Sequence, residues 1–170
     1  MKAYKLTDKN NQTHGKLQWG PNVSHTATGN SDTLCSDGYI HYYKDPLLAV
    51  LLNPIHANFP NPNLWECEAT GVTINEPLKS GSKTVTTIRQ IPLPEVTLTQ
   101  RIAFAILCVK QVYKSTTWLT WADNWLAGIN RTRQTAKAVA DAYAAYAAYA
   151  VAAVNSEINF ALLAQEALKY

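Results

Sequence analysis

Cysteine is scarce in this chain, and its spacing fits neither a disulfide framework nor a metal site. The 170 residues include three cysteines, an odd number, at the widely separated positions Cys35, Cys67 and Cys108. No two cysteines or histidines have the close spacing of a zinc site, such as Cys-x-x-Cys or His-x-x-x-His. The sequence therefore predicts reduced thiols, as in a cytoplasm, and no bound metal.

Glycine is sparse as well, and no cluster of glycines resembles a phosphate-binding loop. Among the seven glycines, Gly71, Gly81 and Gly128 are isolated residues at expected turns. We therefore expect no bound cofactor.

Long hydrophobic runs are also missing. Residues 1–6 lack the apolar core of a signal peptide. Residues 142–156 carry no charge, but this run is shorter than the roughly 20 residues that a membrane helix needs, and alanine is only weakly apolar. We therefore expect a cytoplasmic protein that does not associate with a membrane.

Charged residues make up 16% of the chain, and their net charge of +3 is unevenly distributed. Residues 1–98 contain eight basic and eight acidic residues, whereas residues 99–170 contain seven and four. The positive charge is concentrated between positions 101 and 137, at Arg101, Lys110, Lys114, Arg131, Arg133 and Lys137. These six residues are predicted to bind an anionic partner, although a solvated basic face is the plainer interpretation.

The first half of the chain has the alternating and β-branched pattern of strands. Strands are expected over residues 2–7, 16–19, 39–43, 64–70 and 83–91. Gly71 is expected to form a bulge after which residues 72–74 continue their strand. We expect a loop or an irregular sheet edge over residues 23–33 and a turn at residues 80–82.

One helix is expected within this half. Asp45 and Pro46 have the residue types of an N-cap and a first helical position, and the apolar residues 47–52 follow them. Residues 53–63 contain three prolines and four asparagines and are therefore expected to form an irregular loop.

The composition changes to helical after Pro92 and Pro94, which divides the chain into an α/β subdomain (1–95) and a helical subdomain (96–170). Thr97 and Gln100 have the spacing of a capping box that opens a helix. Trp118, Trp121, Ala122, Trp125 and Leu126 follow the spacing of one helix face, and Gly128 is expected to end that helix. Tryptophans at this spacing favour a core face over a stacking platform for nucleic-acid bases.

An alanine-rich helix is expected over residues 131–170, because no glycine or proline interrupts them. We favour a break at Asn155 and Ser156, since an unbroken helix would span about 60 Å. Tyr143, Tyr146 and Tyr149 fan across roughly 120° of its surface and are predicted to form a packing interface. The predicted fold is therefore α+β: a small mixed or antiparallel sheet with one helix, followed by a bundle of three or four helices.

Two groups of side chains have the residue types of catalysts. Cys35 and His41 could form a nucleophile pair only if the loop between them doubles back, because an extended strand would separate them by about 20 Å. Glu66 and Glu68 share one face of a strand and could act as paired carboxylates, although a solvated surface accounts for them better.

Several segments resemble a family of small proteins of unknown function encoded mostly by phages and prophages. These segments are residues 2–5, 35–47, 65–71, 82–83, 101–106, 118–122 and the Ala/Tyr repeat. The family often has an aromatic residue followed by His and Cys where this chain has residues 39–42, which weakens a catalytic role for a cysteine there. The resemblance implies a phage context and no particular activity.

Three functions from different classes remain open. The first is a non-enzymatic phage protein that binds a host protein or protein–nucleic acid complex through the basic residues, as an anti-CRISPR-like inhibitor does. The second is a binding module or enzyme for a small nucleotide-like anion at the N-terminus of the alanine-rich helix, with His41 or Glu66 handling protons. The third is a structural protein that forms homo-oligomers through the tyrosines.

Overall fold

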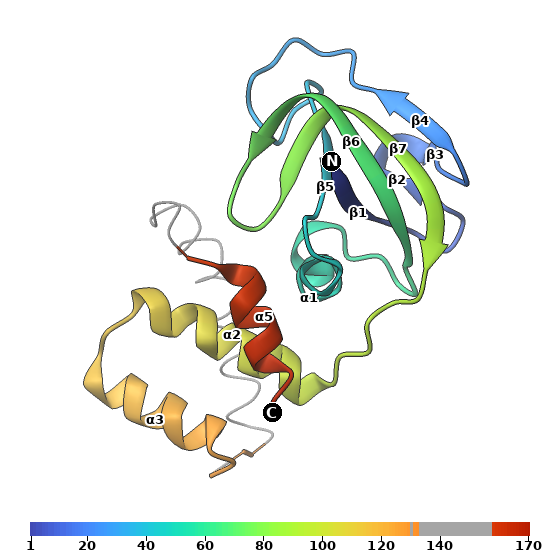
Figure 1. Cartoon of the computed structure of the whole chain (residues 1–170). Coiled ribbons are helices and arrows are strands. Elements are labelled where there is room, and N and C mark those ends of the chain that lie inside the picture. Colours follow the sequence, from blue (N-terminus) through green and yellow to red (C-terminus); the bar gives the residue numbers. More distant parts are fainter. Residues whose placement is uncertain (130, 133–157) are drawn as a thin grey trace. The chain divides into compact units, whose positions relative to one another are not determined.

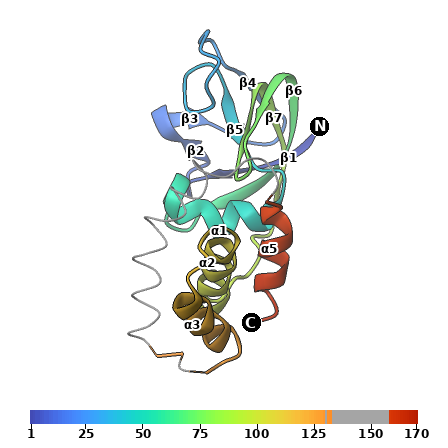
Figure 2. The same cartoon turned by 90° about the vertical axis from the view of Figure 1, so that its left-hand side faces the viewer.

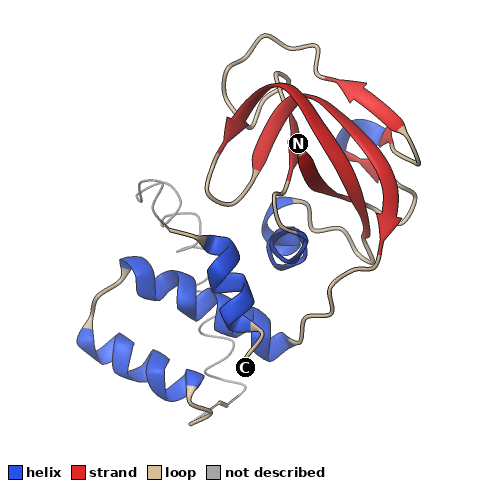
Figure 3. Ribbon diagram, viewed as in Figure 1, coloured by secondary structure: helices blue, strands red, loops and turns tan. Residues whose placement is uncertain are grey.

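The computed structural model describes residues 1–129, 131–132 and 158–170, and the chain divides into two compact units, Met1–Glu95 and Val96–Tyr170. The first unit contains the strands and a single α-helix, whereas the regular structure in the described part of the second unit is helical (Figure 3). The predicted α+β class is confirmed.

The sheet of the N-terminal unit is antiparallel throughout. Its main order is β1-β6-β7-β4, and β5 pairs with a different stretch of β7 (Figure 1). The strands are β1 (Lys2–Thr7), β4 (Val23–Thr26), β5 (Ile40–Tyr42), β6 (Asn63–Asn75) and β7 (Ser80–Ile91). The structure thus selects the antiparallel arrangement over the mixed one.

A single bridge brings the two ends of this sheet together. The amide of Tyr4 in β1 donates to the carbonyl of Tyr43 at 2.8 Å, and the amide of Tyr43 donates back to Tyr4 at 2.7 Å. Because β5 also pairs with β7, the strands β1, β6, β7 and β5 form a closed ring. Closure removes the outer edge that β1 would otherwise expose.

The interior of the ring is apolar. Its central cluster consists of Ala3, Trp19, Tyr42, Cys67, Ala69 and Val85. Trp19 is positioned by a hairpin of β2 (Gln12–Thr13) and β3 (Leu17–Gln18), which the 3₁₀ turn η1 (His14–Lys16) connects. The indole Nε1 of Trp19 donates to the hydroxyl of Thr13 at 3.0 Å, which fixes the ring against the strands.

The helix α1 (Pro46–His56) begins as the sequence predicts and lies across one end of the strands (Figures 1 and 2). The Asp45 carboxylate accepts from the amides of Leu47 and Leu48 at 2.8 and 3.2 Å. The prediction of an irregular loop from residue 53 is wrong at its start, because α1 continues through Pro54 to His56. Pro54 has no amide hydrogen, so the last turn of α1 forms without the helical hydrogen bond that residue 54 would otherwise donate.

Of the two alternatives for residues 23–33, a loop or an irregular sheet edge, the structure has an edge strand, β4. It is joined to β7 by side-chain hydrogen bonds between Thr26 and Thr84 and between Thr86 and Ser24, both 2.9 Å. The prediction of a turn at residues 80–82 is wrong, because these residues lie within β7. Gly81 is required there by close packing, because a Cβ atom would lie 2.6 Å from Leu34.

Other predictions for this unit hold. Strand β1 has the expected bounds, and β6 is bulged near Gly71, whose φ is +80°. All three cysteines lie in described segments and are free thiols, of which Cys35 is exposed. Burial raises the pKa of Cys67 to about 12 and raises that of Cys108 as well.

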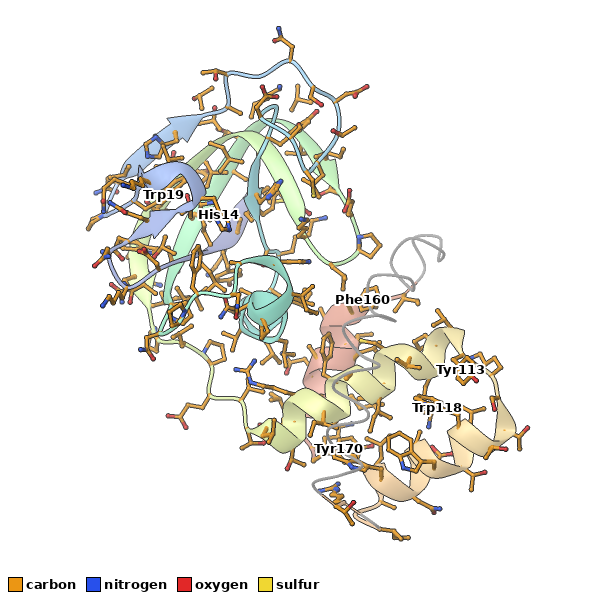
Figure 4. The ribbon with its side chains drawn as sticks, turned by 180° about the vertical axis from the view of Figure 1, so that it is seen from behind. His14, Trp19, Tyr113, Trp118, Phe160 and Tyr170 are labelled. Carbon is orange, nitrogen blue, oxygen red and sulfur yellow. The ribbon has the colours of Figure 1, made fainter. Side chains whose placement is uncertain are left out.

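In the second unit, α2 (Leu98–Val112) packs against both α3 (Thr116–Leu126) and α5 (Phe160–Ala167). The buried face of α3 contains Ala122, Trp125 and Leu126, as its spacing predicts. At the α2–α3 connection, Tyr113 and Trp118 make an edge-to-face contact with centroids 5.6 Å apart (Figure 4). None of the helices in the described ranges has the length and apolarity needed to cross a bilayer.

The ends of these helices follow local signals. At the end of α3, the amides of Gly128 and Ile129 donate to the carbonyls of Trp125 and Asn124 at 3.0 and 2.8 Å, which forms a Schellman motif. Residues 158–159 are not helical, and Asn159 caps α5. The predicted alanine-rich helix is therefore not continuous to residue 170, whereas the favoured break at residues 155–156 lies outside the described residues.

The capping box of α2 provides a test of the helical unit. The Thr97 hydroxyl accepts from the amide of Gln100 at 3.2 Å, and the Gln100 side chain accepts from the amide of Thr97 at 2.9 Å. Thr97→Ala is expected to lower the free energy of unfolding by about 1 kcal/mol, because it leaves an amide of the first turn without its partner. Urea unfolding of Thr97→Ala and Thr97→Ser would measure this, and an equal loss in Thr97→Ser would contradict it.

Candidate functional site

The N-terminal unit contains a cavity of about 100 Å³ on the side of the closing bridge. It is lined by Lys5, Leu6, Thr13, His14, His41, Tyr43, His56, Ala57, Phe59 and Lys79. Five of these side chains are lysine or histidine, and no aspartate or glutamate lines the cavity. The site therefore concentrates basic groups in a unit whose net charge is close to zero.

The fold brings these residues together from distant parts of the chain. Lys5 lies on β1, His14 on the β2–β3 hairpin beside Trp19 (Figure 4), and His41 on β5. His56 ends α1, and Lys79 immediately precedes β7. Ring closure is what places β1 beside β5, so the cavity depends on the topology of the whole unit.

Lys5 is the most buried basic group of the cavity, with 6% of the residue exposed. Its ammonium donates to the carbonyl of His41 at 2.8 Å and lies 4.7 Å from the centroid of Trp19. It forms no ion pair with any acid in the described part of the chain. Because burial disfavours the charged form, the pKa of Lys5 is lowered to about 8.

His56 and Tyr43 form a hydrogen-bonded pair. The Tyr43 hydroxyl and Nδ1 of His56 are 3.0 Å apart, and the two rings are nearly parallel, with an interplanar angle of 16°. Burial, with smaller contributions from Lys79 and His41, lowers the pKa of His56 to about 4. Burial also raises the pKa of Tyr43. Both side chains are therefore neutral at pH 7, and one proton is shared along their hydrogen bond.

His41 is oriented by the backbone. Its Nε2 donates to the carbonyl of Leu34, and a carbonyl can only accept, so Nε2 carries a proton. Burial lowers the pKa of His41, which the Leu34 carbonyl partly opposes, and Lys79 and Lys5 lower it further. In the neutral form, Nδ1 is therefore free of a proton and can accept one.

The loop before β5 does double back, but it does not pair Cys35 with His41. His41 contacts Leu34 instead, and the Cys35 thiol accepts a hydrogen bond from the ammonium of Lys79 at 3.1 Å. Lys79 thus lies between an exposed thiol and the cavity that it lines.

The chemistry of the cavity does not favour a metal. Across the described ranges, no group of three or more His, Cys, Asp or Glu side chains is arranged to hold one. Cationic and neutral donors lining a small, partly open cavity are suited to hold an anion, with hydrogen bonds that strengthen when the donor is charged.

The glutamates considered from sequence are engaged at the surface of the sheet. Glu66 forms ion pairs with Arg89 at 2.9 Å and with Lys2 at 3.3 Å. Hydrogen bonds from Arg89 and then Lys2 lower the pKa of the Glu66 carboxyl. Glu68 lies 3.9 Å from the N-terminal amine. These contacts account for both side chains as parts of a polar surface.

The predicted basic surface is described in part. Arg131 donates to the carbonyls of Trp125 and Leu126, both at 2.8 Å, and its guanidinium lies 4.8 Å from the Trp125 ring. These contacts place its charge at the C-terminal end of α3, where a cation is favourable. Lys110 forms an ion pair with Asp123, and the exposed Lys114 donates to the Lys110 carbonyl at 2.7 Å.

The predicted roles of the remaining residues stay untested. Arg101 lies half-buried in the first turn of α2. Arg133, Lys137 and the tyrosines Tyr143, Tyr146 and Tyr149 lie outside the described residues. A partner-binding surface at these positions stays a prediction.

Most of the cavity was not predicted from sequence, since only His41 was singled out. One signal was available at Lys5. In a strand over residues 2–7, Ala3 and Lys5 share a face, so a lysine was placed on the same side as an apolar residue. His14, His56 and Lys79 carry no comparable local pattern.

Comparisons with known proteins add no relative: no protein-family model, curated protein or solved structure matches the chain. The resemblance to phage-encoded proteins of unknown function stays a prediction.

Proposed function

We propose that the N-terminal unit binds a small anion, a carboxylate or a single phosphoryl group, in the cavity between Lys5, Lys79, His41 and His56. The observation that carries this proposal is a buried lysine without an acidic partner in a cavity that no carboxylate lines. A buried ammonium is costly unless an opposite charge offsets it. A bound anion would supply that charge.

The size of the cavity limits the ligand. Its volume of about 100 Å³ is small beside the roughly 300–1,000 Å³ of pockets that hold drug-sized ligands. A small carboxylate or one phosphoryl group fits this space, whereas a nucleotide would place only its terminal group there. The sequence suggested a nucleotide-like anion as ligand, and the proposal here is limited to a carboxylate or a single phosphoryl group.

Anion binding is expected to weaken as the pH rises above 8. Lys5 titrates at a pKa of about 8 in the free protein, and a bound anion would raise that pKa by favouring the ammonium. Binding then takes up a proton between the free and bound pKa values, so affinity falls by up to about tenfold per pH unit in that window. The other titratable groups that face the cavity or act on its lysine and histidines are Lys79, His14, His41, His56, Tyr43, Glu76 and Cys67, whose buried thiol acts on Lys5.

Calorimetric titration with sulfate and with oxalate at pH 7, 8, 9 and 10, at constant ionic strength, would test this. Neither dianion titrates in this range, so the pH dependence belongs to the protein. Lys79→Gln is expected to weaken binding at least tenfold, and Lys9→Gln, which changes an exposed lysine of the same unit, is the matched control. Equal affinities for wild type and Lys79→Gln would show that the cavity is not the binding site.

A further inference from the structure

Lys5 has the surroundings of a reactive amine as well as of a binding group. Its ammonium has one neutral hydrogen-bond acceptor, the carbonyl of His41, and an aromatic ring beside it. A neutral amine has two hydrogens and a lone pair. It can therefore keep the bond to His41 with one hydrogen while the lone pair remains available for attack.

On the basis of the anion-binding function proposed above, we propose that Lys5 forms a Schiff base with a small 2-oxo acid whose carboxylate is held in the cavity. The chemical class follows from the two features of the site. Lys79 and the imidazole of His56 supply donors for a carboxylate, and Lys5 supplies a nitrogen for the neighbouring carbonyl carbon. Glyoxylate and pyruvate are the smallest members of this class and suit the volume of the cavity.

The condensation balances without an oxidant or reductant. The Lys5 lone pair forms a C–N bond to the carbonyl carbon, and the carbonyl π electrons move to oxygen, which takes a proton. The nitrogen loses a proton to give a carbinolamine. Its hydroxyl takes a second proton and leaves as water as the C–O bond breaks and the nitrogen lone pair forms the C=N bond. The resulting iminium loses its remaining N–H proton, so amine and 2-oxo acid give an imine and water.

The charge state of Lys5 supports this chemistry. With a pKa of about 8, about a tenth of the Lys5 side chain is neutral at pH 7. An ordinary lysine, with a pKa near 10.4, is neutral less than about one time in a thousand at that pH. Amines activated by desolvation are the usual Schiff-base formers in proteins.

Proton transfer is available within the same cavity. His41 carries its proton on Nε2, which leaves Nδ1 as an acceptor for a proton released by the Lys5 nitrogen. The hydrogen-bonded pair of Tyr43 and His56 stays neutral at pH 7, because burial raises the pKa of the phenol and is the largest cause that lowers the pKa of the imidazole to about 4. This pair therefore supplies fixed polar groups rather than a proton at that pH.

The test is reductive trapping on the full chain. The protein is incubated with glyoxylate and sodium cyanoborohydride at pH 7.5, and the initial rate of carboxymethylation at each lysine is measured by mass spectrometry of peptides. We expect Lys5 to react at least tenfold faster than the exposed Lys9 and Lys44. Oxalate, which has the charge but no reactive carbonyl, is expected to slow Lys5 alone, and Lys79→Gln is expected to do the same. Lys5→Met is expected to abolish the fast adduct.

The outcomes distinguish the Schiff base at Lys5 from the anion binding on which it rests. A rate at Lys5 no higher than at Lys9 overturns the Schiff base, and binding of oxalate in the same sample then leaves anion binding intact. Fast labelling of Lys5 that oxalate does not slow overturns the 2-oxo acid as substrate, because the amine then reacts without recognising the carboxylate. If acetaldehyde, which has no charge, labels Lys5 as fast as glyoxylate does, the same conclusion follows.

Discussion

Replacing Lys5 by methionine is expected to raise the free energy of unfolding of the N-terminal unit by about 2 kcal/mol at pH 7. Burial lowers the pKa of Lys5 from its ordinary 10.5 to about 8, and each pH unit between these values corresponds to about 1.4 kcal/mol. The charged side chain therefore destabilises the folded state by about 3 kcal/mol. The hydrogen bond to His41, worth about 1 kcal/mol, is lost in the variant and offsets part of the gain.

The pH dependence of this effect identifies its cause. Because the folded-state pKa of Lys5 lies below the unfolded-state value, the unfolded state binds more protons between pH 8 and 10.5. The free energy of unfolding of the wild type therefore rises with pH through that window, as Lys5 loses its proton. The difference in stability between Lys5→Met and the wild type should shrink accordingly. Urea unfolding of both proteins at pH 7 and pH 10 measures the difference. A constant advantage at the two pH values would show that packing, and not charge, is responsible.

Lys9→Met is the matched control for this variant. Lys9 is exposed and lies in the turn that follows the same strand. Substitutions at such surface positions usually change stability by less than about 0.5 kcal/mol. A stabilisation of Lys9→Met equal to that of Lys5→Met would indicate a general effect of removing positive charge from the unit.

Replacing Trp19 by alanine is expected to lower the free energy of unfolding by about 3 kcal/mol. Trp19 is 2% exposed, covers Lys5, donates to Thr13 at 3.0 Å and makes an edge contact with His25 at 4.6 Å. Removing a buried tryptophan side chain costs about 3–5 kcal/mol. The lower end is expected here, because the opened space admits water to Lys5 and relieves the cost of its burial.

Two further proteins make this second expectation specific. Trp19→Phe keeps an aromatic ring beside Lys5 but loses the bond to Thr13, so it is expected to cost less than Trp19→Ala. In the Lys5→Met background, Trp19→Ala is expected to lower the free energy of unfolding by more than in the wild type, because no buried charge remains to be relieved. Urea unfolding of the wild type, the variants Lys5→Met and Trp19→Ala, and the double variant gives the coupling energy between the two side chains. Additive effects would contradict a direct interaction between the two side chains.

Local signals in the sequence predicted three helix ends correctly, the starts of α1 and α2 and the end of α3. Asp45 and Pro46, Thr97 and Gln100, and Gly128 act through residues two to five positions away, so their roles can be read from a short window. The sequence did not decide between a loop and an edge for β4, because the stability of this strand comes from partners about sixty residues away, such as Thr84 and Thr86. The turn predicted at Gly81 failed because glycine is required there by packing rather than by backbone conformation.

The candidate site was largely hidden from the sequence for the same reason. Lys5, His41, His56 and Lys79 lie on different elements and meet only in the folded ring. The charge count directed attention instead to residues 101–137, where Lys110 is neutralised by Asp123 and Arg131 is bound to carbonyls of α3. Counting charges locates an excess but does not show which charges lack a partner.

Ring closure has a consequence for the order in which the N-terminal unit is made and folded. Strand β1 leaves the ribosome before the strands that pair with it, because its Lys2 lies opposite Glu68 and the ring is completed only where β5 pairs with β7 at residues 80–82. Contacts between residues so far apart in sequence slow folding, because a long loop is ordered before they form. The nascent chain therefore keeps Lys5 in water, charged like an ordinary lysine, until β6 and β7 have been synthesised.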